Sequence, residues 1–342
     1  MDLEALRSRR EQRRRALAHR RRLAGLSLAA ILAVAALAIL ALGSGGSSRG
    51  SRAASASSGR LRATAGPRAR PRQAARHSAG QRPAGAAAST SNGAGTSNGS
   101  GTPGDRPVPI LMYHVINAPP AGAPFPGLYV TPEEFSEQML ALKHAGWHAV
   151  TLDQARAYWT RGASLGPGKP IVLSFDNGYQ SQYSEALPVL RRLGWVGVEN
   201  LQLSGLPPSQ GGLSAGDVRA LVAAGWELDT QGFTHADLIT LDASALHREV
   251  AVAREVIRRR YGVPVNWFCY PSGHYDATVI AAVKAAGYAG STTVIAGWAH
   301  PREDPYRMHR LRVLGGTSAS ELLSLLAGVR GDPPAPASYS GA

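Results

Sequence analysis

From residue 108 to residue 326, short apolar runs alternate with longer segments whose apolar positions recur every three or four residues. The short runs predict buried strands, and the longer segments predict amphipathic helices. We expect strands at 108–114, 148–152, 171–176, 196–203, 226–231, 266–270, 289–295 and 308–314. We expect helices at 132–145, 153–160, 181–193, 214–224, 243–261, 276–286 and 318–326. Such alternation indicates parallel pairing in a doubly wound sheet or a barrel, and the number of strands favours a distorted (β/α) barrel of about seven strands.

The N-terminal part has a different pattern. Leu23 to Leu42 is a run of 20 residues made of Leu, Ala, Ile and Val with one Gly and one Ser, directly after nine Arg in residues 1–22. This length can span about 30 Å of hydrocarbon. We expect a transmembrane anchor at 23–42, with 1–22 in the cytoplasm and the rest of the chain outside the cell membrane. A cleaved signal peptide is the alternative, although the run is long for one.

Residues 43–106 are rich in Gly, Ser, Ala, Thr, Pro and Arg and hold no aromatic residue. Because this composition cannot bury a core, we expect a disordered linker. A folded domain is then expected at 107–330 and a flexible tail at 331–342. The single cysteine, Cys269, excludes an intramolecular disulfide.

The formal charge of +14 comes from the N-terminal part. Residues 1–104 carry 18 Arg and 3 acids, whereas residues 105–342 carry 19 Lys plus Arg and 20 acids. The expected domain is therefore nearly neutral, which argues against nucleic acid as a partner. The basic N-terminus fits an anionic membrane surface.

Polar side chains stand at the ends of several expected strands. Asp176 and Asn177 end the apolar run at 171–176 and precede Gly178, whose freedom of backbone would let both side chains face one cavity. Other strand ends carry His114, Gln231 with His235, and the turn holding Tyr270, Ser272 and His274. Each has a structural alternative as a core residue, cap or turn, but strand ends share one face of a barrel, so together they predict a pocket.

Three segments, 174–178, 231–235 and 268–273, resemble in order and spacing the motifs of the polysaccharide deacetylase family, whose domain is called the NodB-homology domain. Residues 109–114 and 310–313 look like the membrane-linked branch that acts on glucosamine polymers. The resemblance covers roughly residues 107–315. It implies a hydrolase that removes acetyl groups from N-acetylated cell-envelope polysaccharides, acting on an amide bond with the help of a divalent metal, zinc or another.

The resemblance also implies roles for single residues. Asp176 stands at the position of the general base, and Tyr270 lies in the segment that lines the sugar groove and supplies an oxyanion donor. His235, Asn177 and Gln231 stand at the three metal positions. Two of these depart from the family, because Asn177 replaces an Asp and Gln231 replaces a His, and neutral amides have little affinity for zinc.

Two further carboxylates could compensate for these departures. Glu199 and Asp229 lie on expected strands beside the pocket. We hypothesise that they build a carboxylate-rich metal site or an acid/base pair with Asp176. The alternative is that Glu199 pairs with a neighbouring Arg. His114, Ser272 and His274 are further candidates for substrate binding.

Two functions remain open at this stage. The first is a membrane-anchored hydrolase that deacetylates an N-acetylated polysaccharide outside the cell membrane. The second is a catalytically inactive relative that binds glycan in the same groove. Metal content and glycan binding would distinguish the two.

Overall fold

The computed structural model describes residues 101–341 except 205, 207–210 and 329–333. The expected cytoplasmic segment 1–22, the anchor 23–42 and most of the linker 43–106 lie outside the described residues. Within the described part, no helix is both long enough and apolar enough to cross a membrane.

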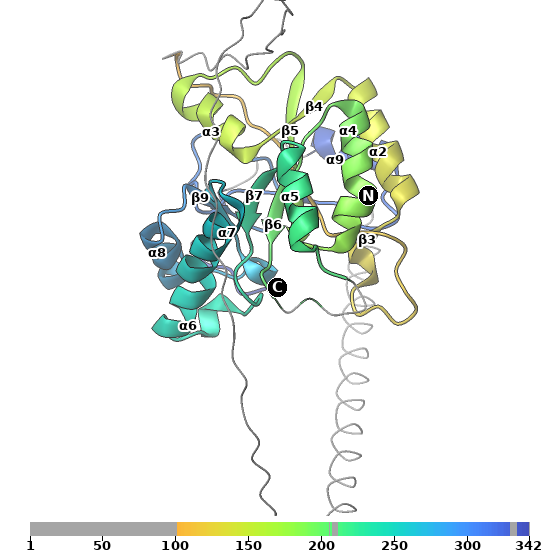
Figure 1. The fold of residues 1–342 in the computed structure, drawn as a ribbon. Coiled ribbons are helices and arrows are strands. Elements are labelled where there is room, and N and C mark those ends of the chain that lie inside the picture. Colours follow the sequence, from red (N-terminus) through yellow and green to blue (C-terminus); the bar gives the residue numbers. More distant parts are fainter. Residues whose placement is uncertain (1–100, 205, 207–210, 329–333, 342) are drawn as a thin grey trace, which may run out of the picture. The chain divides into compact units, whose positions relative to one another are not determined.

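A parallel sheet forms the centre of the described region (Figure 1). Its strands are β1 (Ile110–Tyr113), β4 (Trp147–Val150), β5 (Lys169–Asn177), β6 (Val198–Leu201), β7 (Glu227–Thr230), β8 (Trp267–Cys269), β9 (Gly290–Thr292) and β10 (Leu311–Arg312). The order is β10-β1-β5-β6-β7-β8-β9, with β4 paired to the first half of β5. A second, two-stranded sheet joins β2 (Val115–Ile116) and β3 (Tyr129–Val130).

The two ends of the large sheet meet through the segment before β10. Met308 makes a parallel bridge to Thr292 of β9, while Leu311 pairs with Leu111 of β1. The backbone N–H of Thr293 donates to the Met308 carbonyl at 2.9 Å. The sheet is thus curved in the manner of a (β/α) barrel, and this agrees with the architecture predicted from the alternating pattern.

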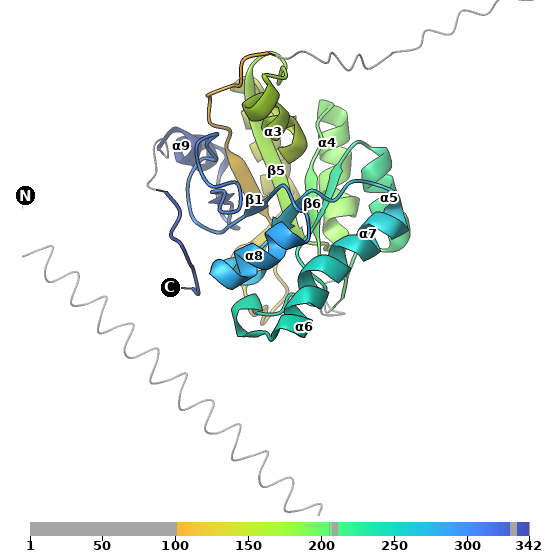
Figure 2. The same cartoon turned by 90° about the vertical axis from the view of Figure 1, so that its left-hand side faces the viewer.

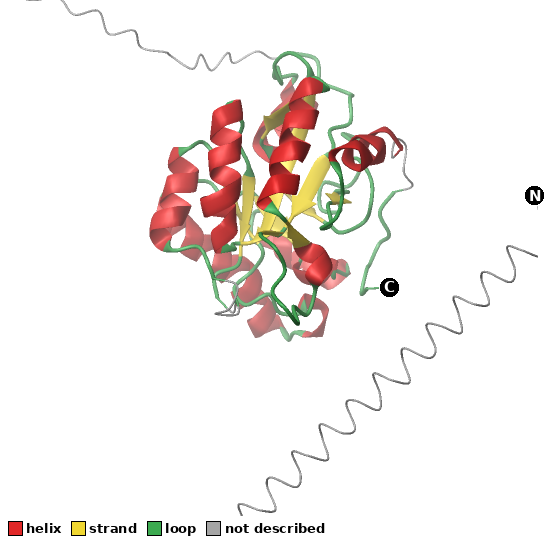
Figure 3. Cartoon of the chain, turned by 90° about the vertical axis from the view of Figure 1, so that its right-hand side faces the viewer, coloured by secondary structure: helices red, strands yellow, loops and turns green. Residues whose placement is uncertain are grey.

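Helices surround the strands (Figure 3). They are α2 (Pro132–His144), α3 (Leu152–Arg161), α4 (Leu187–Leu193), α5 (Ala215–Ala223), α6 (Ala243–His247), α7 (Ala253–Tyr261), α8 (Ala277–Ala285) and α9 (Ala319–Gly328). Short 3₁₀ turns are η1 (Pro126–Leu128), η4 (Leu238–Thr240) and η6 (Pro271–Gly273). The π-helical turns η2 (Gln182–Ala186) and η5 (Arg248–Val252) lead into α4 and α7, so the helices expected at 181–193 and 243–261 are each present with a π turn inside.

Helix starts follow local sequence. Thr131, Thr151 and Ser214 each accept a hydrogen bond from the third helical residue, whose side chain bonds back to the cap. This reciprocal capping satisfies two backbone donors that a helix start otherwise leaves unpaired. At the other end, α4 stops at Gly194, which adopts a left-handed conformation (φ 71°).

The side chains of the strands alternate between two faces of the sheet. On the face toward the helices, Phe175 of β5 stacks on Trp226 and Tyr113 and packs edge to face with Phe135 of α2. On the opposite face, three polar residues pair across neighbouring strands: Asp176, Asn200 and Asp229. A row of buried polar side chains facing the interior of the barrel is the feature that positions the candidate site.

Candidate functional site

A cavity of about 530 Å³ opens at the carboxyl ends of the strands. It is lined by Met112, His114, Val115, Pro124, Phe125, Leu128, Tyr129, Asp176, Asn177, Tyr179, Gln202, Leu206, Gln231, Thr234, His235, Tyr270, Ser272, Gly273, Val294 and Arg312. The strand-end residues on which the sequence analysis relied, Asp176, Asn177, Gln231, His235 and His114, therefore lie in one cavity. Their proposed roles remain predictions.

The backbone at the end of β5 turns so that two consecutive side chains reach this cavity. Asn177 has a φ of 79° and Gly178 a φ of 89°. The φ of Gly178 is one that other residues rarely adopt, and a Cβ atom there would also lie 2.7 Å from Cδ1 of Leu201, so this position favours glycine. Asn177 is among the few residue types that tolerate a left-handed backbone. This conformation explains why Asp176 and Asn177 both line the cavity although they are neighbours on a strand.

Asp176 forms a two-pronged ion pair with Arg310. Nη1 of Arg310 lies 2.7 Å from Oδ1 and Nη2 lies 2.9 Å from Oδ2 of the carboxylate, and both residues are 1% exposed. Burial alone would raise the pKa of Asp176, but the Arg310 guanidinium outweighs it and lowers the pKa to about 2. The carboxylate is therefore ionised throughout the ordinary pH range.

Two neighbours complete this pair. Asn200 donates from Nδ2 to Oδ1 of Asp176 at 2.9 Å, and Sγ of Cys269 lies 3.3 Å from Nη2 of Arg310. The guanidinium that pairs with Asp176 comes from Arg310, which the sequence analysis named only as part of a motif.

His114 lies beside the same carboxylate. Its Nε2 is 4.0 Å from Oδ2 of Asp176, and its Nδ1 is buried without a hydrogen-bond partner among the described residues. Burial lowers the pKa of His114 to about 4. The charge of Asp176 opposes this decrease, and the charge of Arg310 adds to it. The imidazole is therefore neutral near pH 7, and the carboxylate favours the tautomer whose proton sits on Nε2.

Amide side chains form part of the cavity wall. Asn177 donates from Nδ2 to Oε1 of Gln202 at 3.1 Å, and Gln202 in turn donates to the carbonyl of Ser204. Gln231 is 3% exposed, and its Oε1 has no partner among the described residues. His235 is half-buried in a left-handed conformation (φ 60°), and burial lowers its pKa.

This donor set does not fit the divalent metal that the family implies. Among the three residues that the resemblance assigns to a metal, only His235 offers a strong ligand, since Asn177 and Gln231 bring no charge. No group of three His, Cys, Asp or Glu side chains placed to hold a metal ion occurs in the part of the chain that the structure describes. We therefore derive no step through a metal at this site.

Two residues of the 270–274 turn differ from expectation. The hydroxyl of Tyr270 donates to the carbonyl of Tyr306 at 2.9 Å, and its backbone N–H donates to Thr292, so both of its donors are engaged within the protein. Tyr270 lines the cavity but has no donor left for an oxyanion. His274 is absent from the cavity lining because its Nδ1 lies 3.0 Å from Oδ1 of Asp237. Ser272 does line the cavity.

Glu199 lies on the wrong face of the sheet for the role we expected. It is paired in register with Phe175, whereas its neighbour Asn200 is paired with Asp176. Because adjacent strand residues point to opposite faces, Glu199 points toward the helices. It is 0% exposed, and neither of its oxygens has a hydrogen-bond partner among the described residues. Burial, assisted by the charge of Asp176, raises its pKa well above the usual value, so this site favours the protonated carboxyl.

Asp229 shares the inward face with Asp176 but lies too deep to line the cavity. Its Oδ1 accepts the backbone N–H groups of Asn266 and Trp267 at 3.0 and 2.9 Å, which ties it to the start of β8. Burial and the neighbouring Glu227 raise the pKa of Asp229. The expectation that Glu199 and Asp229 rebuild the site is thus not met by their positions.

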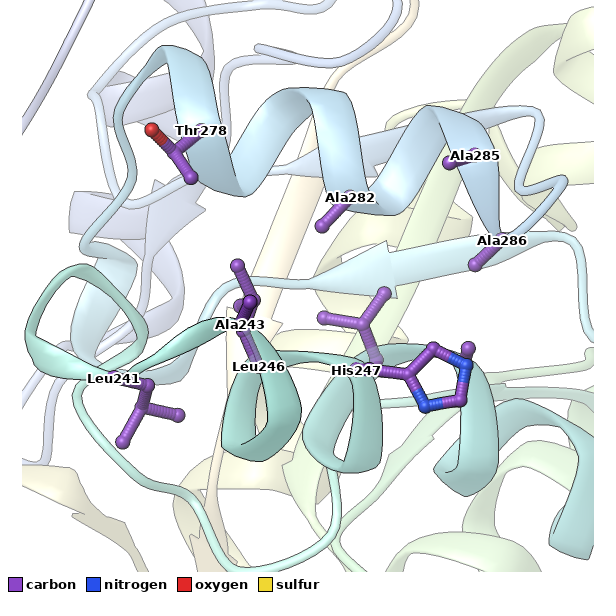
Figure 4. A pocket seen from close by; sticks show the side chains of 10 residues that line it. Leu241, Ala243, Leu246, His247, Thr278, Ala282, Ala285 and Ala286 are labelled. Carbon is purple, nitrogen blue, oxygen red and sulfur yellow. The ribbon is translucent and has the colours of Figure 1, made fainter.

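A second cavity, of about 370 Å³, lies between α6 with η5 and α8 (Figure 4). Figure 2 shows these helices side by side on one flank of the sheet. The lining consists mainly of Leu and Ala side chains, with His247 at its edge. It shares no lining residue with the cavity at the strand ends, and it offers little chemistry of its own.

Comparison with known proteins agrees with the resemblance seen in the sequence. Residues 164–291 match the family model described as polysaccharide deacetylase. The Bacillus subtilis (strain 168) protein YxkH, whose name places it among polysaccharide deacetylases, is 25% identical over 213 residues, or 62% of this chain and 74% of the relative. Residues 164–291 therefore match a polysaccharide deacetylase domain, and the resemblance seen in the sequence is confirmed to that extent.

Two other relatives add detail. The solved Streptococcus pyogenes deacetylase PplD in complex with acetate has a TM-score of 0.59 at 22% identity, covering 66% of this chain and 99% of that chain, and this likeness shows the fold alone. A shorter match, 39% identical over 62 residues, is to the poly-beta-1,6-N-acetyl-D-glucosamine N-deacetylase of Escherichia coli (strain K12). It covers 18% of this chain and 9% of the relative.

Proposed function

We propose that this domain hydrolyses acetamido groups of an N-acetylated cell-envelope polysaccharide, with Asp176 and His114 as its reacting pair. The observation that carries the proposal is the position of a neutral histidine beside a permanently ionised carboxylate at the floor of the cavity. The substrate class follows from the family and from the relative that acts on poly-N-acetylglucosamine.

The geometry suggests a division of labour between the two residues. The oxygens of Asp176 are occupied by Arg310 and Asn200, and its pKa of about 2 makes it a weak base. His114 has a buried, unpartnered Nδ1, which would take a proton from a water that enters with the substrate, and Asp176 would stabilise the imidazolium that forms. The imidazolium would then return the proton to the leaving amine, as a single histidine does in other hydrolases.

A second candidate function is glycan binding without turnover. The observation that favours it is the replacement of two metal positions by Asn177 and Gln231. Without a metal to polarise the amide carbonyl, the barrier to attack by water remains high. Both candidates place the same ligand in the same cavity, so they differ only in whether acetate is released.

We further propose that the domain works on the outer side of the cell membrane, held there by the segment 23–42 through the linker 43–106. The support is the apolar length of this segment and the nine Arg that precede it.

Acetate release from N-acetylglucosamine oligomers, measured with the full-length chain in detergent, tests the proposal. We expect release that a chelator does not reduce and that His114→Gln lowers by about 10²-fold or more, the size of a lost acid–base catalyst. The rate should stay level toward acid until pH falls through about 4, where His114 becomes protonated.

The matched control is His247→Gln, a histidine at the edge of the second cavity, which should leave the rate unchanged. Binding of the oligomers with no acetate release would select the second candidate. Absence of binding would exclude both, and loss of activity on chelation would overturn the metal-free reading.

A further inference from the structure

Among the carboxamides of the cavity wall, Gln231 alone has an oxygen that is buried without a partner among the described residues. It is 3% exposed, it lines the cavity, and its buried Oε1 accepts no hydrogen bond there. The other two amides of the wall, Asn177 and Gln202, are bonded to each other. A buried acceptor left unpaired is costly, so a side chain of this kind in a cavity indicates a ligand that donates to it.

The backbone holds Gln231 firmly in place. Its N–H donates to the carbonyl of Leu201 at 3.0 Å, which continues the pairing of β6 with β7. The next residue, Gly232, has a φ of 91°, and a Cβ atom there would meet Oε2 of Glu249 at 3.0 Å. The carboxamide is therefore presented by a rigid strand end, as a residue that decides specificity should be.

We propose that Gln231 is the specificity-determining residue for the acetamido group, which it recognises by a hydrogen bond between the two amides. The proposal rests on the proposed function, because it assigns a ligand to the same cavity. An acetamido group is a secondary amide with one N–H donor and one carbonyl acceptor, and a carboxamide can bond to either. Gln231 would thus bind the acetamido group through a neutral hydrogen bond, where a metal ion would otherwise contact that group.

The charges of the cavity agree with a neutral ligand. The Arg310 guanidinium donates to both oxygens of Asp176, so its positive charge is already paired within the protein. A carboxylate or phosphate has no N–H to offer to Oε1 of Gln231 and would lie near the ionised Asp176. An O-acetyl ester also lacks the N–H, so the cavity should distinguish the amide from the ester although their shapes are nearly the same.

Binding measured by calorimetry with the full-length chain, in the presence of a chelator, tests this proposal. We compare an N-acetylglucosamine oligomer with an oligomer of glucose and with one carrying O-acetyl in place of N-acetyl. Wild-type protein should prefer the N-acetylated oligomer by about tenfold or more over each. The near-isosteric Gln231→Met should lose most of that preference, whereas Gln154→Met on the exposed side of α3 should keep it.

Three results would overturn the proposal: equal affinity of the wild type for the three oligomers, an unchanged preference in Gln231→Met, or loss of the preference on chelation. If Gln231→Met does not fold, the series of oligomers on the wild type still decides the matter. Failure of the proposed function would look different, because the wild type would then bind none of the oligomers.

Discussion

The two faces of the central sheet each bury a carboxyl group, and they treat it in opposite ways. Asp176 of β5 faces the interior of the barrel, while Glu199 of β6 faces the helices. Both are essentially inaccessible to water. The pKa of Asp176 falls to about 2, whereas that of Glu199 rises well above its usual value. Burial is the largest influence on both, so their difference comes from what else surrounds them.

The difference shows that a buried acid keeps its charge only where the fold supplies a partner. Arg310 meets Asp176 with two short hydrogen bonds, and Asn200 adds a third. Glu199 has no hydrogen-bond partner among the described residues, and the like charge of Asp176 adds to the rise of its pKa. The inward face thus holds a charged carboxylate at the cavity, and the outward face favours the protonated form of its acid.

The largest expected effect on stability comes from removing Arg310, the partner of Asp176 on the inward face of the sheet. Arg310→Met should destabilise the protein by about 3–5 kcal/mol, because it leaves Asp176 buried with an uncompensated charge. Chemical denaturation at pH 7 measures this. Arg307→Met is the matched control, since that guanidinium is about a quarter exposed and pairs with Asp304, so its loss should cost less than about 1 kcal/mol.

Adding Asp176→Asn to Arg310→Met should recover a large part of the lost stability. If the single change cost no more than its control, the ion pair would not be what holds the charge on this face.

The next effect in size belongs to His114, beside the same carboxylate. Its pKa in the folded protein, about 4, lies below the unfolded value of 6.5. The unfolded state therefore binds the proton more readily, and stability is lost as pH falls from 6.5 toward 4, by about 1.4 kcal/mol per unit. Between pH 7 and pH 4, the wild type should therefore lose up to about 3 kcal/mol of unfolding free energy relative to His114→Gln. A difference that stays constant with pH would mean that His114 titrates normally.

Much of the inward face of the sheet could be predicted from the sequence. The strands were found because apolar runs are clear signals, and parallel strands bring their carboxyl ends to one place, which brought Asp176, Gln231 and His235 together. Arg310 was missed because its partner lies 134 positions away. The available signal was an arginine within an apolar strand segment, which requires a carboxylate partner nearby.

The error at Glu199 has a simpler cause. Glu199 and Asn200 are both polar and adjacent, so on a strand only one of them can face the cavity. The sequence does not say which, because the choice depends on the register between β5 and β6. That register pairs Asn200 with Asp176 and leaves Glu199 outside.

The smallest effect we predict, and the one opposite in sign, is at Glu199. Glu199→Gln should stabilise the protein at pH 7 by about 1–3 kcal/mol, because it replaces an acid whose ionised form is disfavoured by burial with a neutral group of the same size. For an acid whose folded pKa is raised, the stability it contributes is complete below the unfolded pKa of about 4.5 and is lost as pH rises toward the folded pKa. The gain in Glu199→Gln should therefore grow as pH rises above about 4.5 in urea denaturation. The exposed Glu255→Gln on α7, which breaks surface pairs with Arg258 and Arg259, should change stability by about 0.5 kcal/mol or less at every pH. A destabilised Glu199→Gln would instead imply that the carboxylate is charged and partnered, and the contrast between the two faces would fail.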